Sequence, residues 1–201
     1  MASEVDIVNI GLVQLGAARI NSLGDNIKAA REARAIYEFN RDAEIESHKW
    51  KFAIRLASLP ALVDGPIWTS TFSLLYQLPN DFLRLEMAGD LFPGASFTNY
   101  RNGPDQDYAI QNGQIATNIP APLDIRYVAR VTDPTEFDPL FVMTLGYRMG
   151  MALAETLTQS TAKAQAAAAA YGSELSRAIQ IGAVQEPSRG IADSAWILSR
   201  M

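Results

Sequence analysis

The stretch DPLFVMTLGYRMGMALAETL, residues 138–157, decides the fold class of this chain. Asp138 followed by Pro139 is a typical helix start, because aspartate caps the first turn and proline is tolerated at the first helical position. Apolar or small residues then recur at spacings of three and four, which places on one helix face Leu140, Met143, Tyr147, Gly150, Ala154 and Leu157. The stretch therefore predicts a long helix that packs through one narrow face.

A second helix with the same kind of face follows a short joint at residues 159–161, where Ser160 is a candidate cap. Its small and apolar positions are Ala164, Ala168, Tyr171, Leu175 and Ala178. Because the joint is short, the two helices are predicted to pair as an antiparallel hairpin. We expect the seam between them to be made by Tyr147, Gly150, Ala154, Leu157, Ala168 and Tyr171.

Residues 1–58 also have a helical pattern. Ser3 is a candidate cap for a first helix whose apolar face repeats through Val8 and Leu12, and a second, amphipathic helix is expected after Asn26. The segment 47–59 is expected either to continue that helix or to form a separate one.

Residues 59–138 differ from both flanks, because eight of the ten prolines lie there. Proline lacks a backbone donor, so long helices are disfavoured. Short strands are expected instead at 72–78, 82–87 and 124–131, and Asn112-Gly113 is a strong signal for a hairpin turn. The sequence thus predicts an α+β, mainly α protein. A helical bundle domain (1–182) carries a small antiparallel β-rich insertion at about 60–138, and an extended C-terminal docking tail follows (183–201).

The amino-acid composition excludes several kinds of functional site. The chain has 201 residues, a net charge of −5, no cysteine and a single histidine, His48. This composition excludes disulfides, thiolate nucleophiles and paired-histidine metal sites, and it argues against a sequence-independent nucleic-acid binder. The most apolar stretch is interrupted by Arg148, and the N-terminus lacks the basic start of a signal peptide. We therefore expect a soluble protein without membrane insertion and without a cofactor.

Carboxylate pairs are the remaining catalytic option. Asp42, Glu44 and Glu46 lie close in sequence, as do Asp105 and Asp107. A glycoside hydrolase needs two carboxylates about 5–10 Å apart across a sugar site. Solvated surface acids explain both groups more simply, and His48 is more simply a structural residue. A cell-envelope hydrolase carried on a virion stays open as the alternative function, acting on peptidoglycan or polysaccharide.

Three strings occur in order: RDAE at 41–44, HKWKFA at 48–53 and YQLPNDFLRL at 76–85. In this order they resemble the tail tubular protein A family, the head-to-tail adaptors of short-tailed, T7-like bacteriophages. Lys49 stands where that family more often has proline. The similarity covers roughly residues 5–160, and none of the strings is catalytic.

The resemblance implies a structural, non-enzymatic virion protein, located in the tail and assembled in the host cytoplasm. It implies self-association into a ring of twelve subunits. One face of the ring would dock on the portal protein and the other on a tail nozzle of the tail tubular protein B type. DNA would pass through during ejection without sequence-specific binding.

Two groups of residues are candidates for these contacts. The tail carries an apolar cluster that we expect to meet the portal or a neighbouring subunit, although it could fold back on its own domain: Trp196, Ile197 and Leu198, with Arg200 beside them. Residues 64–138 carry ten acidic and four basic side chains. We expect some of the acids to face the lumen and repel DNA, or else only to keep loops soluble: Asp81, Glu86, Asp90, Asp105, Asp107 and Asp124.

Overall fold

The structure is a computed structural model that describes residues 2–62, 72–89 and 108–184. Within these ranges the chain forms four α-helices, two short 3₁₀ turns and two three-stranded antiparallel sheets. The helices are α1 (Glu4–Gln14), α2 (Lys28–Ser47), α3 (Pro139–Thr158) and α4 (Thr161–Val184). The strands are β1 (Ile54–Leu59), β2 (Leu74–Gln77), β3 (Phe82–Ala88), β4 (Tyr108–Gln111), β5 (Gln114–Thr117) and β6 (Leu123–Ala129). The fold is thus α+β and mainly α, as predicted.

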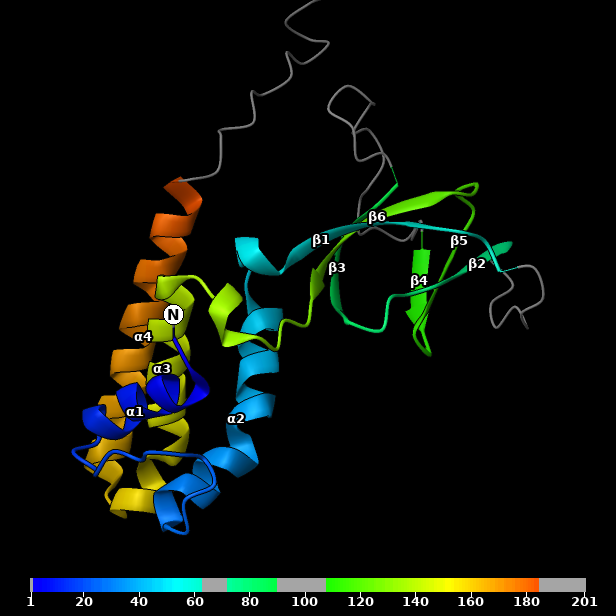
Figure 1. Cartoon of the computed structure of the whole chain (residues 1–201). Coiled ribbons are helices and arrows are strands. Elements are labelled where there is room, and N and C mark those ends of the chain that lie inside the picture. The colour runs from blue at the N-terminus through cyan, green and yellow to red at the C-terminus, as the bar shows by residue number, and fades with distance from the viewer. Residues whose placement is uncertain (1, 63–71, 90–107, 185–201) are drawn as a thin grey trace, which may run out of the picture.

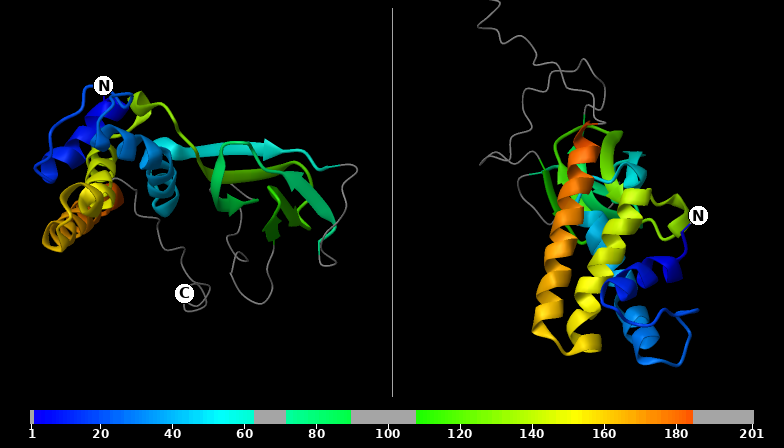
Figure 2. Two further views of the ribbon diagram at one scale, coloured as in Figure 1. Left: turned by 90° about the horizontal axis from the view of Figure 1, so that it is seen from below. Right: turned by 90° about the vertical axis from the view of Figure 1, so that its left-hand side faces the viewer.

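The helices and the sheets occupy opposite ends of the molecule (Figure 1). Helices α1, α3 and α4 lie together, and α2 stands between them and the β portion, leading into β1. Two further views show the same separation (Figure 2). The two ends are joined by the α2–β1 connection and by the segment from β6 to α3, in which Val128 and Val131 belong to the core of the helical bundle.

The ends of α1 and α3 follow from local residues. Ser3 and Asp6 form a capping box on α1, each side chain bonding to the other residue's backbone. Helix α3 begins at Pro139 after Asp138, and it ends at Gln159, which adopts a left-handed conformation with φ of 50°. Because that residue reverses the chain at once, α4 starts at Thr161 and the predicted helical hairpin forms.

The predicted seam needs two corrections. Gly150 faces α1 rather than α4: a Cβ placed on Gly11 would lie 2.5 Å from the backbone nitrogen of Gly150. Ala168 is exposed, and its neighbour Ala167 on α4 is buried instead. Both are alanines one residue apart, so the spacing pattern could not tell them apart. Of the other predicted seam residues, Ala154 is buried, and Tyr147, Leu157 and Tyr171 are half-buried.

The β portion starts earlier than predicted. Helix α2 ends at Ser47, and residues 54–59 form strand β1 rather than a helix. Strand β6 lies at the centre of the first sheet, between β1 and β3, and the second sheet has the order β2-β5-β4. The strands expected at 72–78 and 82–87 exist as β2 and β3, but they belong to different sheets.

The two sheets share a small core of their own. Every second side chain of β6 is buried in this core. Leu123, Ile125 and Tyr127 belong to it together with Tyr76 of β2 and Ile115 of β5. The hairpin between β4 and β5 turns at Asn112 and Gly113, whose φ angles are 53° and 71°. Positive φ at both central residues is the signature of the type I′ turn that the Asn-Gly pair predicted.

Candidate docking pocket at the helix–sheet joint

Residues of the first and third family-like strings make contacts at the joint between the helical bundle and the sheets. The Asp42 carboxylate lies between two guanidinium groups, 2.9 Å from Arg41 and 2.8 Å from Arg130. Arg84 of β3 donates to the backbone carbonyl of Glu46 at the end of α2. These contacts tie α2 to the strand ends, so the string residues build the joint.

The third string is also structural. The Tyr76 hydroxyl donates to the carbonyl of Ile119 at 2.7 Å, and the Tyr127 hydroxyl donates to the Asp81 carboxylate at 3.1 Å. Burial raises the pKa of Tyr127 above its usual value, and the Asp81 carboxylate raises it further. Both hydroxyls therefore act as neutral donors that fix loop ends.

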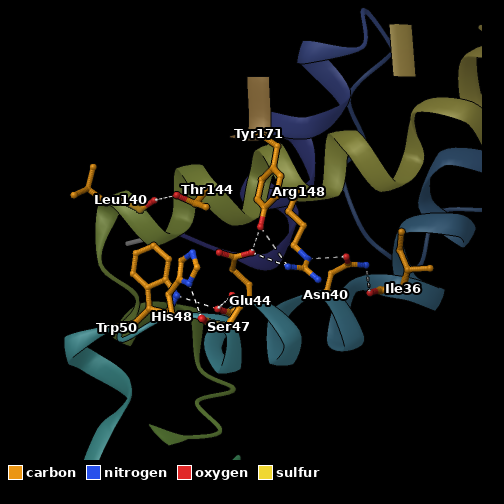
Figure 3. Close-up of polar contacts among 10 residues, drawn as sticks. All are labelled: Ile36, Asn40, Glu44, Ser47, His48, Trp50, Leu140, Thr144, Arg148 and Tyr171. Carbon is orange, nitrogen blue, oxygen red and sulfur yellow. Dashed lines mark hydrogen bonds and ion pairs between the residues drawn. The ribbon is translucent and has the colours of Figure 1, made fainter. Parts of the chain in front are cut away.

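A buried ionic network links α2, α3 and α4 (Figure 3). Glu44 is fully buried, and its Oε2 accepts from Arg148 at 2.9 Å and from the Tyr171 hydroxyl at 2.8 Å. Arg148 also donates from Nε to the Asn40 side chain at 3.1 Å. Burial and the neighbouring Glu44 carboxylate raise the pKa of Tyr171 to about 12. This network was not predicted from the sequence. The one available signal was the charged Arg148 within an apolar helix, because a buried charge requires a partner of opposite charge.

Trp50 connects this network to the aromatic core. Its indole N–H donates to the backbone carbonyl of Glu44 at 3.0 Å, and its ring meets Phe141 edge to face at 5.0 Å. The Trp50 side chain is buried. Beside it, His48 Nδ1 lies 2.6 Å from the Ser47 carbonyl, while His48 Nε2 is a buried atom without a hydrogen-bond partner.

A cavity of about 540 Å³ opens where these elements meet. Its apolar lining comes from Trp50, from Leu140 at the start of α3, and from Ala178, Ile179 and Ile181 at the end of α4. Its polar lining includes His48, Lys49, Lys51, Arg84 and Asp138. A cavity with this apolar lining is suited to an apolar group.

The predicted lumen-facing acids have different surroundings. Glu86 is largely buried and lies 2.6 Å from Arg84 and 3.6 Å from Lys49, so its charge is neutralised rather than free. Asp81 accepts from Tyr127, and Asp124 is half-buried on β6 opposite Ser58. The remaining acids and the predicted tail contacts lie outside the described residues: Asp90, Asp105, Asp107, Trp196, Ile197, Leu198 and Arg200.

The three carboxylates of α2 that were considered for catalysis have different surroundings. Glu44 is bound inside the helical bundle, Asp42 is ion-paired at the joint, and the Glu46 side chain is exposed. None of the three lines the cavity. Within residues 2–62, 72–89 and 108–184, no cluster of three acidic or histidine side chains could hold a metal ion, and no helix is long and apolar enough to cross a membrane.

No family model matches the chain, and no curated protein matches it. A functional proposal therefore depends on the sequence resemblance and on the geometry of the joint.

Proposed function

We propose that this protein is a structural component of a bacteriophage virion: a head-to-tail adaptor that assembles as a ring between the portal and the tail nozzle. The ring forms part of the conduit for DNA ejection, in the virion tail. Its subunits are made and assembled in the host cytoplasm, and twelve subunits match the symmetry implied by the resemblance.

One observation carries the proposal. Residues of two of the strings that resemble the adaptor family contact elements that carry another string: Arg84 donates to the Glu46 carbonyl on α2, and Lys49 lies 3.6 Å from Glu86 on β3. Contacts that hold the helical bundle against the sheets are expected in a protein with a structural role in an assembly. They supply no arrangement for acid–base or nucleophilic chemistry.

The proposal assigns the tail cluster around Trp196 to the portal or a neighbouring subunit. Large aromatic and aliphatic side chains dominate the energetics of protein interfaces. It assigns Asp81, Asp90, Asp105, Asp107 and Asp124 to the lumen, where negative charge prevents adhesion to DNA phosphates. Glu86 is left out of that set, because Arg84 and Lys49 neutralise it.

The experiment is particle imaging of the purified protein mixed with its portal ring. A twelve-fold layer of density on the portal is expected with the full chain, and no layer is expected after removal of residues 186–201. Unchanged thermal unfolding of the shortened chain serves as the control for folding. Full assembly by the shortened chain would refute the docking role of the tail. A full-length chain that never meets the portal, but cleaves peptidoglycan or polysaccharide, would support the hydrolase instead.

A further inference from the structure

Strand β1 is one edge of the first sheet. It pairs with β6 on one side only, and in the left view of Figure 2 it lies along the outer border of the β portion. Natural proteins protect sheet edges with bulges, prolines or lysines, because unpaired backbone groups bind other strands. The other edge, β3, has two register shifts, whereas β1 pairs in a regular register and contains neither proline nor lysine. Strand β1 is therefore the unprotected edge of this sheet.

The bonds of β6 show which backbone groups of β1 face outward. The Gly89 N–H, at the end of β3, donates to the carbonyl of Asp124, so the even-numbered residues of β6 direct their backbone groups towards β3. The direction alternates along a strand, so the odd-numbered residues of β6 face β1. They lie opposite the odd-numbered residues of β1. The residues of β1 whose backbone groups face outward are therefore Ile54, Leu56 and Ser58.

Most of these outward groups have no partner within the part of the chain that the structure describes. The Ile54 N–H donates to the carbonyl of Lys51, at the 3₁₀ turn before β1. The free groups are then the carbonyl of Ile54 and both backbone groups of Leu56 and Ser58. On the same edge, the Leu56 side chain is 68% exposed. An exposed apolar side chain among free backbone groups favours pairing with another strand.

A second copy of β1 matches the pattern of free groups. If two β1 strands meet antiparallel across a two-fold axis at Leu56, each Leu56 N–H donates to the Leu56 carbonyl of the partner subunit. Each Ser58 N–H then faces the free carbonyl of Ile54 of the partner subunit. Every free donor thus gains an acceptor, and the missing donor at Ile54 leaves only the Ser58 carbonyl in water.

The side chains are compatible with the same register. Opposite residues of an antiparallel pair lie on the same face of the sheet, so the two exposed Leu56 side chains meet each other. Arg55 lies opposite Ala57 of the partner subunit, so like charges are not placed opposite each other. The edge is therefore self-complementary in both its hydrogen bonds and its side chains.

We propose that the free protein forms a two-fold dimer through antiparallel pairing of β1, centred on Leu56. A contact limited to six-residue strands is smaller than the roughly 1,200 Å² at which stable interfaces begin, so the dimer is weak and depends on concentration. A two-fold contact closes on itself and cannot repeat around a ring. The dimer is therefore a form of the unassembled protein, and it goes beyond the proposed adaptor function.

The register can be tested by disulfide formation, because the chain has no cysteine. Leu56→Cys places two thiols opposite each other, where the Cα atoms of an antiparallel pair are about 5.5 Å apart and a disulfide can form. Ser58→Cys is the matched control, because Ser58 is also exposed on β1 but lies about 13 Å from its own copy in this register. In a glutathione buffer, we expect about tenfold more disulfide-linked dimer from Leu56→Cys.

A second measurement keeps the chain free of cysteine. Leu56→Lys places two like charges opposite each other, and it should raise the dimer dissociation constant about tenfold in sedimentation equilibrium. Val13→Lys, at an exposed apolar position on α1, should leave that constant unchanged. Both positions are exposed, so thermal unfolding of the two variants should stay close to that of the wild type.

Three outcomes would overturn the proposal. The first is equal disulfide formation by the two cysteine variants. The second is a wild-type protein that stays monomeric at the highest concentration reached, which would leave the β1 edge to a strand of another protein. The third is a ring that forms without a disulfide in Leu56→Cys, which would support the adaptor and contradict the dimer. Neither measurement involves the portal, so failure here is distinguishable from failure of the adaptor function.

Discussion

In the helical bundle, α1 and α3 touch through backbone at Gly11 and Gly150, whereas in the β portion the two sheets touch through side chains such as Tyr76 and Ile125. The bundle also buries an ionic network around Glu44, while the ion pairs that join bundle to sheets are partly exposed. Helices in backbone contact have no space for an added side chain, and a buried charge is destabilising when its ion-pair partner is removed. Substitutions should therefore destabilise the protein most in the helical bundle and least at the joint.

Removal of the Glu44 carboxylate should have the largest effect. Glu44→Ala leaves Arg148 and Tyr171 without their common acceptor inside the bundle, and breaking a buried pair costs about 3–5 kcal/mol. Glu46→Ala, two residues away and exposed, should change stability little. Urea unfolding of both variants makes the measurement. Equal stabilities would show that the network contributes nothing special to the bundle.

A methyl group between α1 and α3 should have the next effect. Gly11→Ala places a Cβ 2.5 Å from the backbone nitrogen of Gly150 and 2.7 Å from the carbonyl oxygen of Gly146, and overpacking costs about 1–3 kcal/mol. Gly172→Ala is the control, because nothing lies within 4 Å of its added Cβ and alanine favours a helix. Calorimetry should give a lower melting temperature for the first and an unchanged or higher one for the second. A tolerated Gly11→Ala would refute the strict fit.

The hairpin in the β portion should be less sensitive. Gly113→Ala meets only the tip of Gln77 at 3.7 Å, so its cost comes from the backbone, whose φ is 71°. A left-handed alanine costs about 1–2 kcal/mol. Denaturant unfolding should show a loss smaller than that of Glu44→Ala, and hydrogen exchange should locate it in β4 and β5. A loss spread over the helices would mean that the two regions unfold as one unit.

An exposed ion pair at the joint should have the smallest effect. Glu136→Gln removes the charge that lies 3.2 Å from Arg55, where both side chains are about half exposed. Such pairs contribute about 0–1 kcal/mol, and salt screens them. The difference from wild type should vanish at high ionic strength, whereas the Glu44→Ala difference should persist. A large loss that is independent of salt would place the joint in the same class as the bundle.

The sequence alone determined the elements whose signals are local. Capping residues and three-to-four spacing located α1, α3 and α4, and the Asn112-Gly113 pair located the β4–β5 hairpin, because each depends only on neighbouring residues. The short run at 54–59 was ambiguous, since six residues with a mixed pattern suit a strand or the end of a helix, and packing against β6 makes it a strand.

Only the tertiary structure shows which helices, strands and side chains contact one another. The pattern marked Gly150 as a contact position but not its partner, which is Gly11 on α1. It gave no sign that β2 and β3 belong to different sheets, that Ala167 rather than Ala168 is buried, or that Glu44 pairs with Arg148 and Tyr171. The cavity is assembled from the end of α2, strand β3, the start of α3 and the end of α4. Local chemistry fixes which face of an element is apolar, but partners far apart in the chain are chosen by the steric fit and charge pairing of the whole fold.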